Sequence, residues 1–141
     1  MTVRAWLVVA ALVLAGCAGE PFDPQAGDCL RIDEDAVEGD PTAEVTIVDC
    51  EDEHELEVFH TFELEMDQTR GEARVEAIAE ACLGEAFTEY VGVPQEESEL
   101  ELLPLPPSDD DVADGDLTVR CTVRPSDGGT TTGSVRGAAD V

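Results

Sequence analysis

The chain contains no lysine and no asparagine, and positive charge of any kind is scarce. Seven Arg face 34 Asp and Glu, which gives a formal net charge of -27. Nucleic-acid binding needs Lys and Arg to displace phosphate counterions, so this composition excludes a nucleic-acid partner. Aromatic residues are few as well, at 4%, yet hydrophobic residues make up 43% of the chain. That is too apolar for a disordered acidic chain, and one small folded domain is expected.

The sequence motifs of common catalytic and cofactor sites are also missing. There is no Gly-x-Ser-x-Gly, no phosphate loop and no dinucleotide fingerprint, and no serine lies beside a histidine in the sequence. Carboxylate pairs of the kind that glycosidases use are abundant, but too few aromatic residues remain to line a sugar cleft. The sequence therefore predicts a protein that is not an enzyme, with no catalytic residue and no cofactor.

No apolar run is long enough to span a membrane. The longest comprises residues 5–15, and at about 1.5 Å per residue it falls well short of a hydrocarbon core of roughly 30 Å. It follows Arg4 and ends in Leu14-Ala15-Gly16-Cys17, the arrangement of a signal peptide that closes on a bacterial lipobox. An ordinary secretory signal with an incidental Cys17 is the alternative. The lipobox predicts cleavage before Cys17 and acylation of its thiol. Two acyl chains are enough to anchor a protein stably to a membrane.

Four parts are expected along the chain. Residues 1–16 form a lipoprotein signal peptide, 17–27 the lipidated cysteine and a short tether, 28–126 the folded domain, and 127–141 a flexible tail rich in Gly, Thr and Ser. This organisation places the domain on the extracytoplasmic face of the cell membrane, where disulfides persist.

The four cysteines beyond Cys17 indicate two disulfides, because an even number in an exported domain is typical of such a framework. None of them has Cys-x-x-Cys spacing, and no metal site is predicted. Three pairings are possible, and spacing alone does not choose between them. Cys82 and Cys121 fall on the apolar faces of a predicted helix and a predicted strand. This favours joining Cys82 to Cys121 and Cys29 to Cys50.

Hydrophobic periodicity predicts one helix and five strands, and hence an α+β fold. The strand at 56–64 alternates cleanly, which places His60 on the core face and both Glu57 and Phe59 on the opposite face. The strands are expected at residues 30–32, 45–48, 56–64, 100–102 and 117–124. In this order the elements predict one helix packed on a small, mostly antiparallel sheet, stapled by two disulfides.

The predicted helix begins at a capping box, with Thr69 as its N-cap and Glu72 three residues later, and it ends before Gly92. Its apolar stripe is expected to face the core. That stripe comprises Val75, Ile78, Ala79, Cys82, Ala86, Phe87 and Tyr90. The Asp-rich stretch from Ser108 onward is expected to be a solvated loop.

Six short motifs occur in a fixed order around the four cysteines. They are Gly27-Asp28-Cys29-Leu30, Val48-Asp49-Cys50, His54 with Glu57-Val58, Cys82 with Tyr90, Gly115-Asp116 before Val119-Arg120-Cys121, and Gly133-Ser134-Val135-Arg136-Gly137. In this order they resemble the septum-formation domain family of actinobacterial envelope proteins, over about residues 27 to 137. The chain departs from that family in having Glu53 before the histidine, where a proline is usual. The resemblance implies an exported or membrane-tethered domain linked to cell division and septation.

His54 lies among carboxylates, which suggests two interpretations. One is a metal or protonation site; the other, which we favour, is a loop histidine that binds backbone and fixes the turn into the next strand. His54 and His60 would lie roughly 20 Å apart along a strand, too far to chelate one ion. The Asp-rich stretch fails the EF-hand pattern, because with Gly115 as the turn residue the twelfth position is Cys121.

The predicted function is a lipid-anchored, non-catalytic, extracytoplasmic binding module with an accessory role in septum formation or cell-envelope assembly. The candidate binding residues are His54, Glu57 and Arg136. The predicted partners are the membrane, through the lipid on Cys17, and an envelope or division protein. The alternative is a cation-binding or ion-responsive surface lipoprotein that uses the carboxylate density itself.

Overall fold

The computed structural model describes residues 22–33 and 45–138. The predicted signal peptide, Cys17 and the first residues of the tether lie outside these ranges. The strands are β1 Cys29–Ile32, β2 Val45–Val48, β3 Leu56–Glu63, β4 Leu100–Leu102 and β5 Thr118–Pro125. The helices are α1 Gly71–Leu83, α2 Glu85–Val91 and α3 Asp109–Asp114, with short 3-10 turns η2 Met66–Gln68 and η3 Gln95–Glu97.

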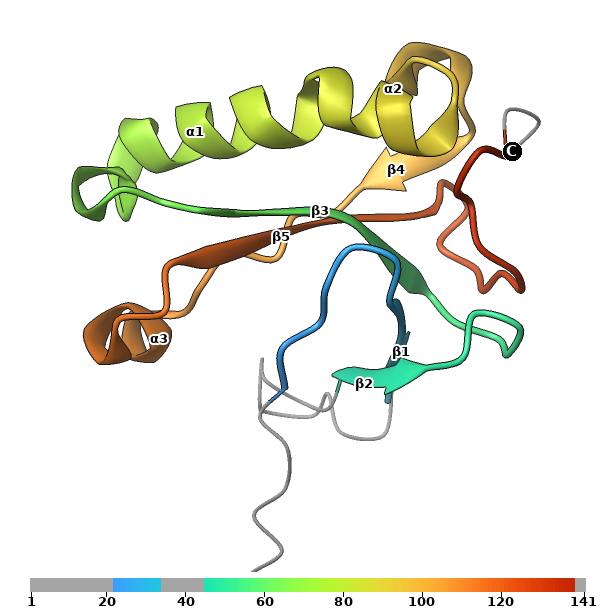
Figure 1. The fold of residues 1–141 in the computed structure, drawn as a ribbon, viewed down its shortest axis with the longest axis horizontal. Helices are drawn as coiled ribbons and strands as arrows, with labels where there is room; N and C mark the ends of the chain where they lie inside the picture. Colours follow the sequence, from blue (N-terminus) through green and yellow to red (C-terminus); the bar gives the residue numbers. More distant parts are fainter. Residues whose placement is uncertain (1–21, 34–44, 139–141) are drawn as a thin grey trace, which may run out of the picture.

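The five strands form one sheet in the order β2-β1-β3-β5-β4, and every neighbouring pair is antiparallel. Helices α1 and α2 lie end to end across one side of β3 and β5, while β1 and β2 lie on the other side of the molecule (Figure 1). The predicted α+β fold with an antiparallel sheet is confirmed.

A bulge at Phe59 overturns the predicted faces of β3. The pairing of β3 with β5 shifts register between Val58 and His60. Before the bulge Leu56 and Val58 pack in a cluster with Leu30, whereas Phe59 is buried in the cluster under the helices. One extra residue exchanges the two faces of a strand. After the bulge, His60 and Phe62 therefore lie on the helix side together with Phe59. His60 is only half-buried there, so the prediction of His60 inside with Phe59 outside is wrong.

The predicted single helix is two helices that meet at Gly84. A Cβ at Gly84 would lie 2.7 Å from the carbonyl oxygen of Glu80, and Gly84 itself is extended, at φ -80° and ψ -153°. The predicted capping box is also wrong. Helix α1 begins at Gly71 with Arg70 as N-cap, and the hydroxyl of Thr69 instead donates to the carbonyl of Met66, at 3.0 Å.

The Asp-rich stretch forms the short helix α3 rather than a loop. Ser108 caps it, because its hydroxyl oxygen accepts from the backbone N–H of Asp111 at 3.2 Å and the Asp111 carboxylate accepts from the backbone N–H of Ser108 at 2.8 Å. A capping box therefore begins α3, in a stretch where the sequence predicted a loop.

Both predicted disulfides are present. Cys82–Cys121 joins α1 to β5 inside the main apolar cluster, and Cys29–Cys50 joins β1 to the turn that follows β2. Cys82–Cys121 therefore ties a helix to the sheet, as the placement of both residues on apolar faces predicted, whereas Cys29–Cys50 links the ends of two neighbouring strands.

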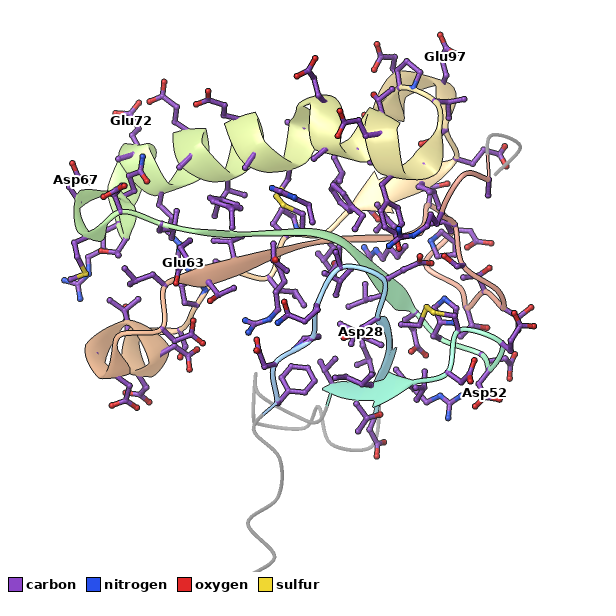
Figure 2. The ribbon with its side chains drawn as sticks, viewed as in Figure 1. Asp28, Asp52, Glu63, Asp67, Glu72 and Glu97 are labelled. Carbon is purple, nitrogen blue, oxygen red and sulfur yellow. A yellow bond between two sulfur atoms is a disulfide. The ribbon has the colours of Figure 1, made fainter. Side chains whose placement is uncertain are left out.

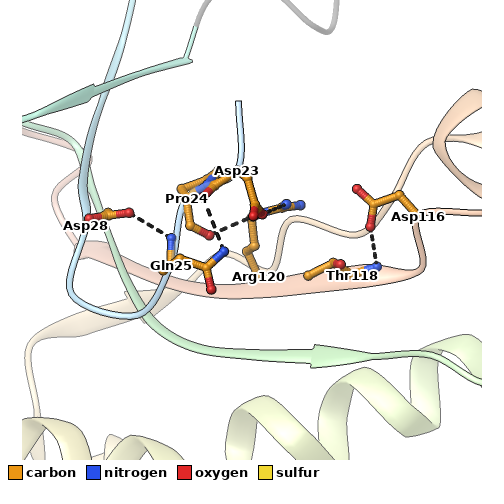
Figure 3. A network of polar contacts seen from close by, with 7 residues as sticks. All are labelled: Asp23, Pro24, Gln25, Asp28, Asp116, Thr118 and Arg120. Carbon is orange, nitrogen blue, oxygen red and sulfur yellow. Dashed lines mark hydrogen bonds and ion pairs between the residues drawn. The ribbon is translucent and has the colours of Figure 1, made fainter. Parts of the chain in front are cut away.

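The described end of the tether lies against β5. The Arg120 guanidinium forms an ion pair with Asp23 at 2.8 Å and donates to the carbonyl of Pro24 at 3.2 Å (Figure 3). The N–H of Gly27 donates to the carbonyl of Val58 at 2.7 Å. Residues 22–27, which the sequence assigned to the tether, thus pack against the folded domain.

Candidate functional site

The segment that follows β5 packs on the domain. His54 and Thr131 exchange backbone hydrogen bonds at 3.0 and 2.9 Å, the N–H of Gly133 donates to the carbonyl of Cys50, and Val135 is buried. The expectation of a flexible tail does not hold for residues 127–138, and residues 139–141 lie outside the described part of the chain. These contacts bring Ser134, Val135 and Arg136 beside β3.

Glu57, a candidate binding residue, fastens this C-terminal segment to the sheet. Its side chain is 1% exposed. One carboxylate oxygen accepts from the hydroxyls of Tyr90 and Ser134, both at 2.6 Å, and the other accepts from the backbone N–H of Val135 at 2.8 Å. A carboxylate buried without such donors would be strongly destabilising, so these bonds explain how Glu57 is accommodated. They join β3, α2 and the C-terminal segment at one point.

Tyr90 is held in its neutral, donating form by this environment. Burial, and then the hydrogen bond and negative charge of Glu57, raise the pKa of the Tyr90 phenol to about 12. Removing that proton would place two negative charges side by side in a buried site. The phenol therefore keeps its proton for the bond to Glu57 across the neutral range.

Arg136 covers the outer side of the same tyrosine. Its guanidinium carbon lies 4.5 Å from the centroid of the Tyr90 ring, a cation–π contact. A Cβ at Gly27, where φ is +103°, would come within 3.2 Å of the Arg136 guanidinium, so glycine leaves room for this approach. Arg136, His60 and Glu89 also line a small hollow of about 290 Å³. The structure thus brings Arg136 and Glu57 together through Tyr90.

His54 is fully buried and its contacts are those of a histidine that holds a turn. Its Nδ1 lies 2.9 Å from the carbonyl oxygen of Asp52, and its backbone pairs with Thr131. No hydrogen-bond partner for Nε2 occurs among the described residues. These contacts match the interpretation that the sequence favoured.

Cys29, His54 and Glu57 have potential ligand atoms within 4.8 Å of one another, but they do not make a metal centre. The sulfur of Cys29 is bonded to Cys50 and has no thiolate to offer. Both oxygens of Glu57 already accept hydrogen bonds. That leaves the Nε2 of His54 and at most one lone pair of Glu57, fewer than the three or four protein ligands of a zinc site.

An apolar groove on α1 is a feature that the sequence reasoning missed. The predicted stripe of α1 was expected to face the core, but within α1 only Cys82 is buried, and Val75 is 67% exposed. Leu83, which extends the stripe, is 57% exposed. The groove measures about 420 Å³ and lies between α1 and the segment after β4. It is lined by Val75, Ile78, Ala79, Cys82, Leu83, Leu102, Pro104 and Pro106.

Two sequence signals point to this groove. Val75, Ala79 and Leu83 are four residues apart, so they continue along one line of the helix and widen the apolar stripe toward solvent. The prolines at 104 and 106 end the strand pattern while remaining apolar. Only the packing shows that the two features face each other across an open space.

The fold and site define a small α+β module that is stapled by two disulfides, fastened by a buried carboxylate and open along one apolar groove. The model of the septum formation family matches residues 26–140, and the chain belongs to that family. This confirms the resemblance and supports a role in septum formation or cell division. No curated protein and no solved structure matches the chain. Within residues 22–33 and 45–138, no helix has the length and apolarity needed to cross a membrane.

Proposed function

We propose that this chain is a lipid-anchored, extracytoplasmic binding module that takes an accessory part in septum formation or envelope assembly by docking a partner protein. The lipobox-like Leu14-Ala15-Gly16-Cys17 supports the anchor. Membership of the septum formation family supports the process in which the module takes part.

The observation that carries the docking role is the open groove on α1. Apolar side chains at Val75 and Leu83 are left in water, although burying such a side chain is worth about 1.5–3 kcal/mol. Contiguous apolar surface rimmed by polar residues is typical of an interaction site. A partner that covered this groove would recover that free energy.

The polar cluster supports a non-catalytic role. Both oxygens of Glu57 accept hydrogen bonds, the Tyr90 hydroxyl donates one of them, and His54 is fully buried. A general acid or base has to reach the atom that it protonates or deprotonates, and these three groups are directed at the protein's own chain. The cation-binding alternative rests on the density of carboxylates alone. In the Cys29, His54 and Glu57 cluster, the cysteine is in a disulfide and the carboxylate accepts hydrogen bonds from the protein itself.

Site-specific photo-crosslinking of the full chain in dividing cells tests the docking role. A photoreactive residue at Leu83, in the groove, is compared with one at Ile47, on β2, which is 48% exposed and lies away from the groove. We expect Leu83 to give an adduct with one envelope or division protein, identified by mass spectrometry and enriched at the septum, and Ile47 not to give it. Equal labelling from both positions, or no adduct from Leu83, contradicts the docking role.

The anchor is tested separately with Cys17→Ala. We expect the variant to remain unprocessed or to be released from the membrane fraction, whereas wild type stays in it. A variant that is processed and membrane-bound like wild type contradicts lipid anchoring at Cys17.

A further inference from the structure

We infer that the groove on α1 accepts a basic amphipathic helix of a partner protein. The inference rests on the proposed docking role and adds the chemistry of the partner. It follows from the length of the groove, from the backbone of its second wall and from the charges on its rim.

The groove has the dimensions of a helix-binding site. From Val75 to Leu83 the α1 wall spans eight residue steps, which is about 12 Å, or roughly two turns of a partner helix. Two turns present apolar residues at positions i, i+3 or i+4, and i+7 on one face. A groove of about 420 Å³ holds a few such side chains.

The second wall resists an extended strand. Leu103 and Leu105 donate their backbone N–H groups to β5, so the alternation of the chain turns the backbone of Leu102, Pro104 and Pro106 away from the sheet. Proline has no N–H group, and two of these three residues therefore offer no donor to an added strand. The edge beyond β4 favours a partner that docks through side chains, as a helix does in a groove.

The solvent side of the groove is negatively charged. Glu72, Glu76 and Glu80 are exposed and follow one another at four-residue spacing beside the line of Val75, Ala79 and Leu83. Figure 2 shows Glu72 on the outer side of α1, pointing away from the sheet. No ion pair joins any of the three to another residue in the described part of the chain.

This rim selects among possible occupants. A second copy of the chain and an anionic bilayer both carry negative charge, and each would be repelled by a chain of formal net charge -27. A helix with Lys or Arg on the flanks of its apolar face would bury its apolar side chains in the groove and place its cations beside the carboxylates.

Two synthetic peptides test the inference against the full chain held in phosphatidylcholine nanodiscs. One is an 18-residue helical peptide with Leu at positions i, i+4 and i+7 and Lys on both flanks, and its twin carries Glu in place of every Lys. Fluorescence anisotropy of the labelled peptides measures Kd at low and high salt, with empty nanodiscs as background. We expect saturable binding of the Lys peptide, no binding of the Glu twin, and an affinity that falls with salt.

Paired variants separate the groove from its charge. Val75→Gln with Leu83→Gln is expected to weaken binding of the Lys peptide by about tenfold or more. Its control is Phe22→Gln with Ile47→Gln, at exposed apolar positions on the N-terminal segment and β2, across the sheet from α1 (Figure 1). This control is expected to leave Kd unchanged. Thermal unfolding confirms that each variant folds.

The rim has its own matched pair. Glu76→Gln with Glu80→Gln is expected to weaken binding several-fold at low salt and to reduce the salt dependence. The control, Glu51→Gln with Asp52→Asn, removes the same charge at the turn after β2, where Asp52 lies far from α1 (Figure 2). It is expected to change binding little.

Three results overturn the inference. They are equal binding of the Glu twin, unchanged binding by the Val75 and Leu83 double variant, and a dimer of the chain itself that this double variant abolishes. A septal adduct from Leu83 in cells without binding of the Lys peptide removes the basic-helix partner and leaves the docking role standing. Absence of both removes the docking role as well.

Discussion

On the helix side of the sheet, one buried region is held together by apolar packing and another by hydrogen bonds to a carboxylate. Around Cys82–Cys121 the contacts are apolar, and Phe59 meets Phe87 edge to face at a centroid distance of 5.6 Å. Near Cys29–Cys50 the centre is a carboxylate, Glu57, whose two oxygens receive three hydrogen bonds.

The two regions differ in how strictly they fix the positions of their residues, more than in how much surface they bury. Apolar packing is non-directional, and cores accept changes of residue when volume is kept. A buried carboxylate accepts only arrangements that bring donors to it, and a lost donor leaves an unsatisfied charge. The apolar region therefore holds α1 on the sheet, whereas the polar region determines where Tyr90 and the C-terminal segment lie.

The two disulfides give the largest expected effects and a first test of the comparison. The Cys82–Cys121 bond spans a sequence separation of 39 residues and Cys29–Cys50 one of 21. In the chain-entropy model the longer loop contributes about 4 kcal/mol and the shorter about 3 kcal/mol. Replacing each pair with two alanines and measuring the free energy of unfolding in urea should give losses in that order. The reverse order would show that local contacts of the polar region outweigh loop length.

Conservative changes at the two centres should separate them further. Glu57→Gln keeps the size of the side chain but turns an amide donor toward groups that already donate, and we expect a loss of about 2–3 kcal/mol. Phe87→Leu in the apolar region should cost less, about 1.5 kcal/mol or below. In Glu57→Gln, hydrogen exchange should also rise across residues 127–138, which depend on the carboxylate. Equal losses, with exchange unchanged there, would contradict the assignment of Glu57 as the fastener of this segment.

Alkaline titration gives a smaller effect that is specific to the polar region. The pKa of Tyr90 is raised from 10.0 to about 12 in the folded protein. Between these values the unfolded chain has lost the phenolic proton and the folded chain has kept it. The contribution of Tyr90 to stability is therefore complete below pH 10 and is lost as pH rises toward 12.

Tyr90 is the only tyrosine, so its ultraviolet difference spectrum reports this titration without interference from another phenol. We expect a midpoint near pH 12 in the folded protein, and Tyr90→Phe should remove the alkaline loss of stability that this group causes. A midpoint near 10 while the protein is still folded would show that the bond to Glu57 is not maintained in solution.

The smallest expected effect lies at the surface, outside both regions. Hydrogen bonds from Thr118 and the charge of Arg120 lower the pKa of Asp116 below 3.8 (Figure 3). The stability that this carboxylate adds is present above its unfolded pKa and disappears as pH falls through the lowered value. Asp116→Ala should reduce the midpoint of thermal unfolding slightly at pH 6, and this difference should shrink as pH falls through the lowered pKa of Asp116. A difference that persists in acid would point to packing instead of charge.

Much of the apolar region was predictable from the sequence, because its signals are local and periodic. β5 alternates without interruption, and Cys121 lies on its apolar face. The spacing of Cys82 from Phe87 and Tyr90 likewise indicated a helix that packs on the sheet. The disulfide between the two elements followed from those two faces, and the structure confirms it.

The polar region was not predictable in the same way. The alternation from Leu56 to Leu64 is regular in the sequence, and the bulge at Phe59 arises only from pairing with β5. That shift moves His60 and Phe62 from the face of Leu56 and Val58 to the face of Phe59. Alternation alone already set Glu57 and Phe59 on one face, but it did not show that this face is buried as well. The Gly-, Thr- and Ser-rich composition after Asp127 suggested a tail, since composition does not reveal that a carboxylate 77 residues away accepts from Ser134.

The ion pair of Asp23 with Arg120 also limits how the domain can move relative to a bilayer. Because Asp23 is held against β5, only six residue steps separate this point of attachment from Cys17, a span of at most about 22 Å. In the proposed anchored state the domain therefore stays close to the bilayer surface, where it can tilt and rotate. The N-terminal segment and α1 lie on opposite sides of the sheet (Figure 1). In the anchored state this short connection therefore turns the groove away from the membrane surface.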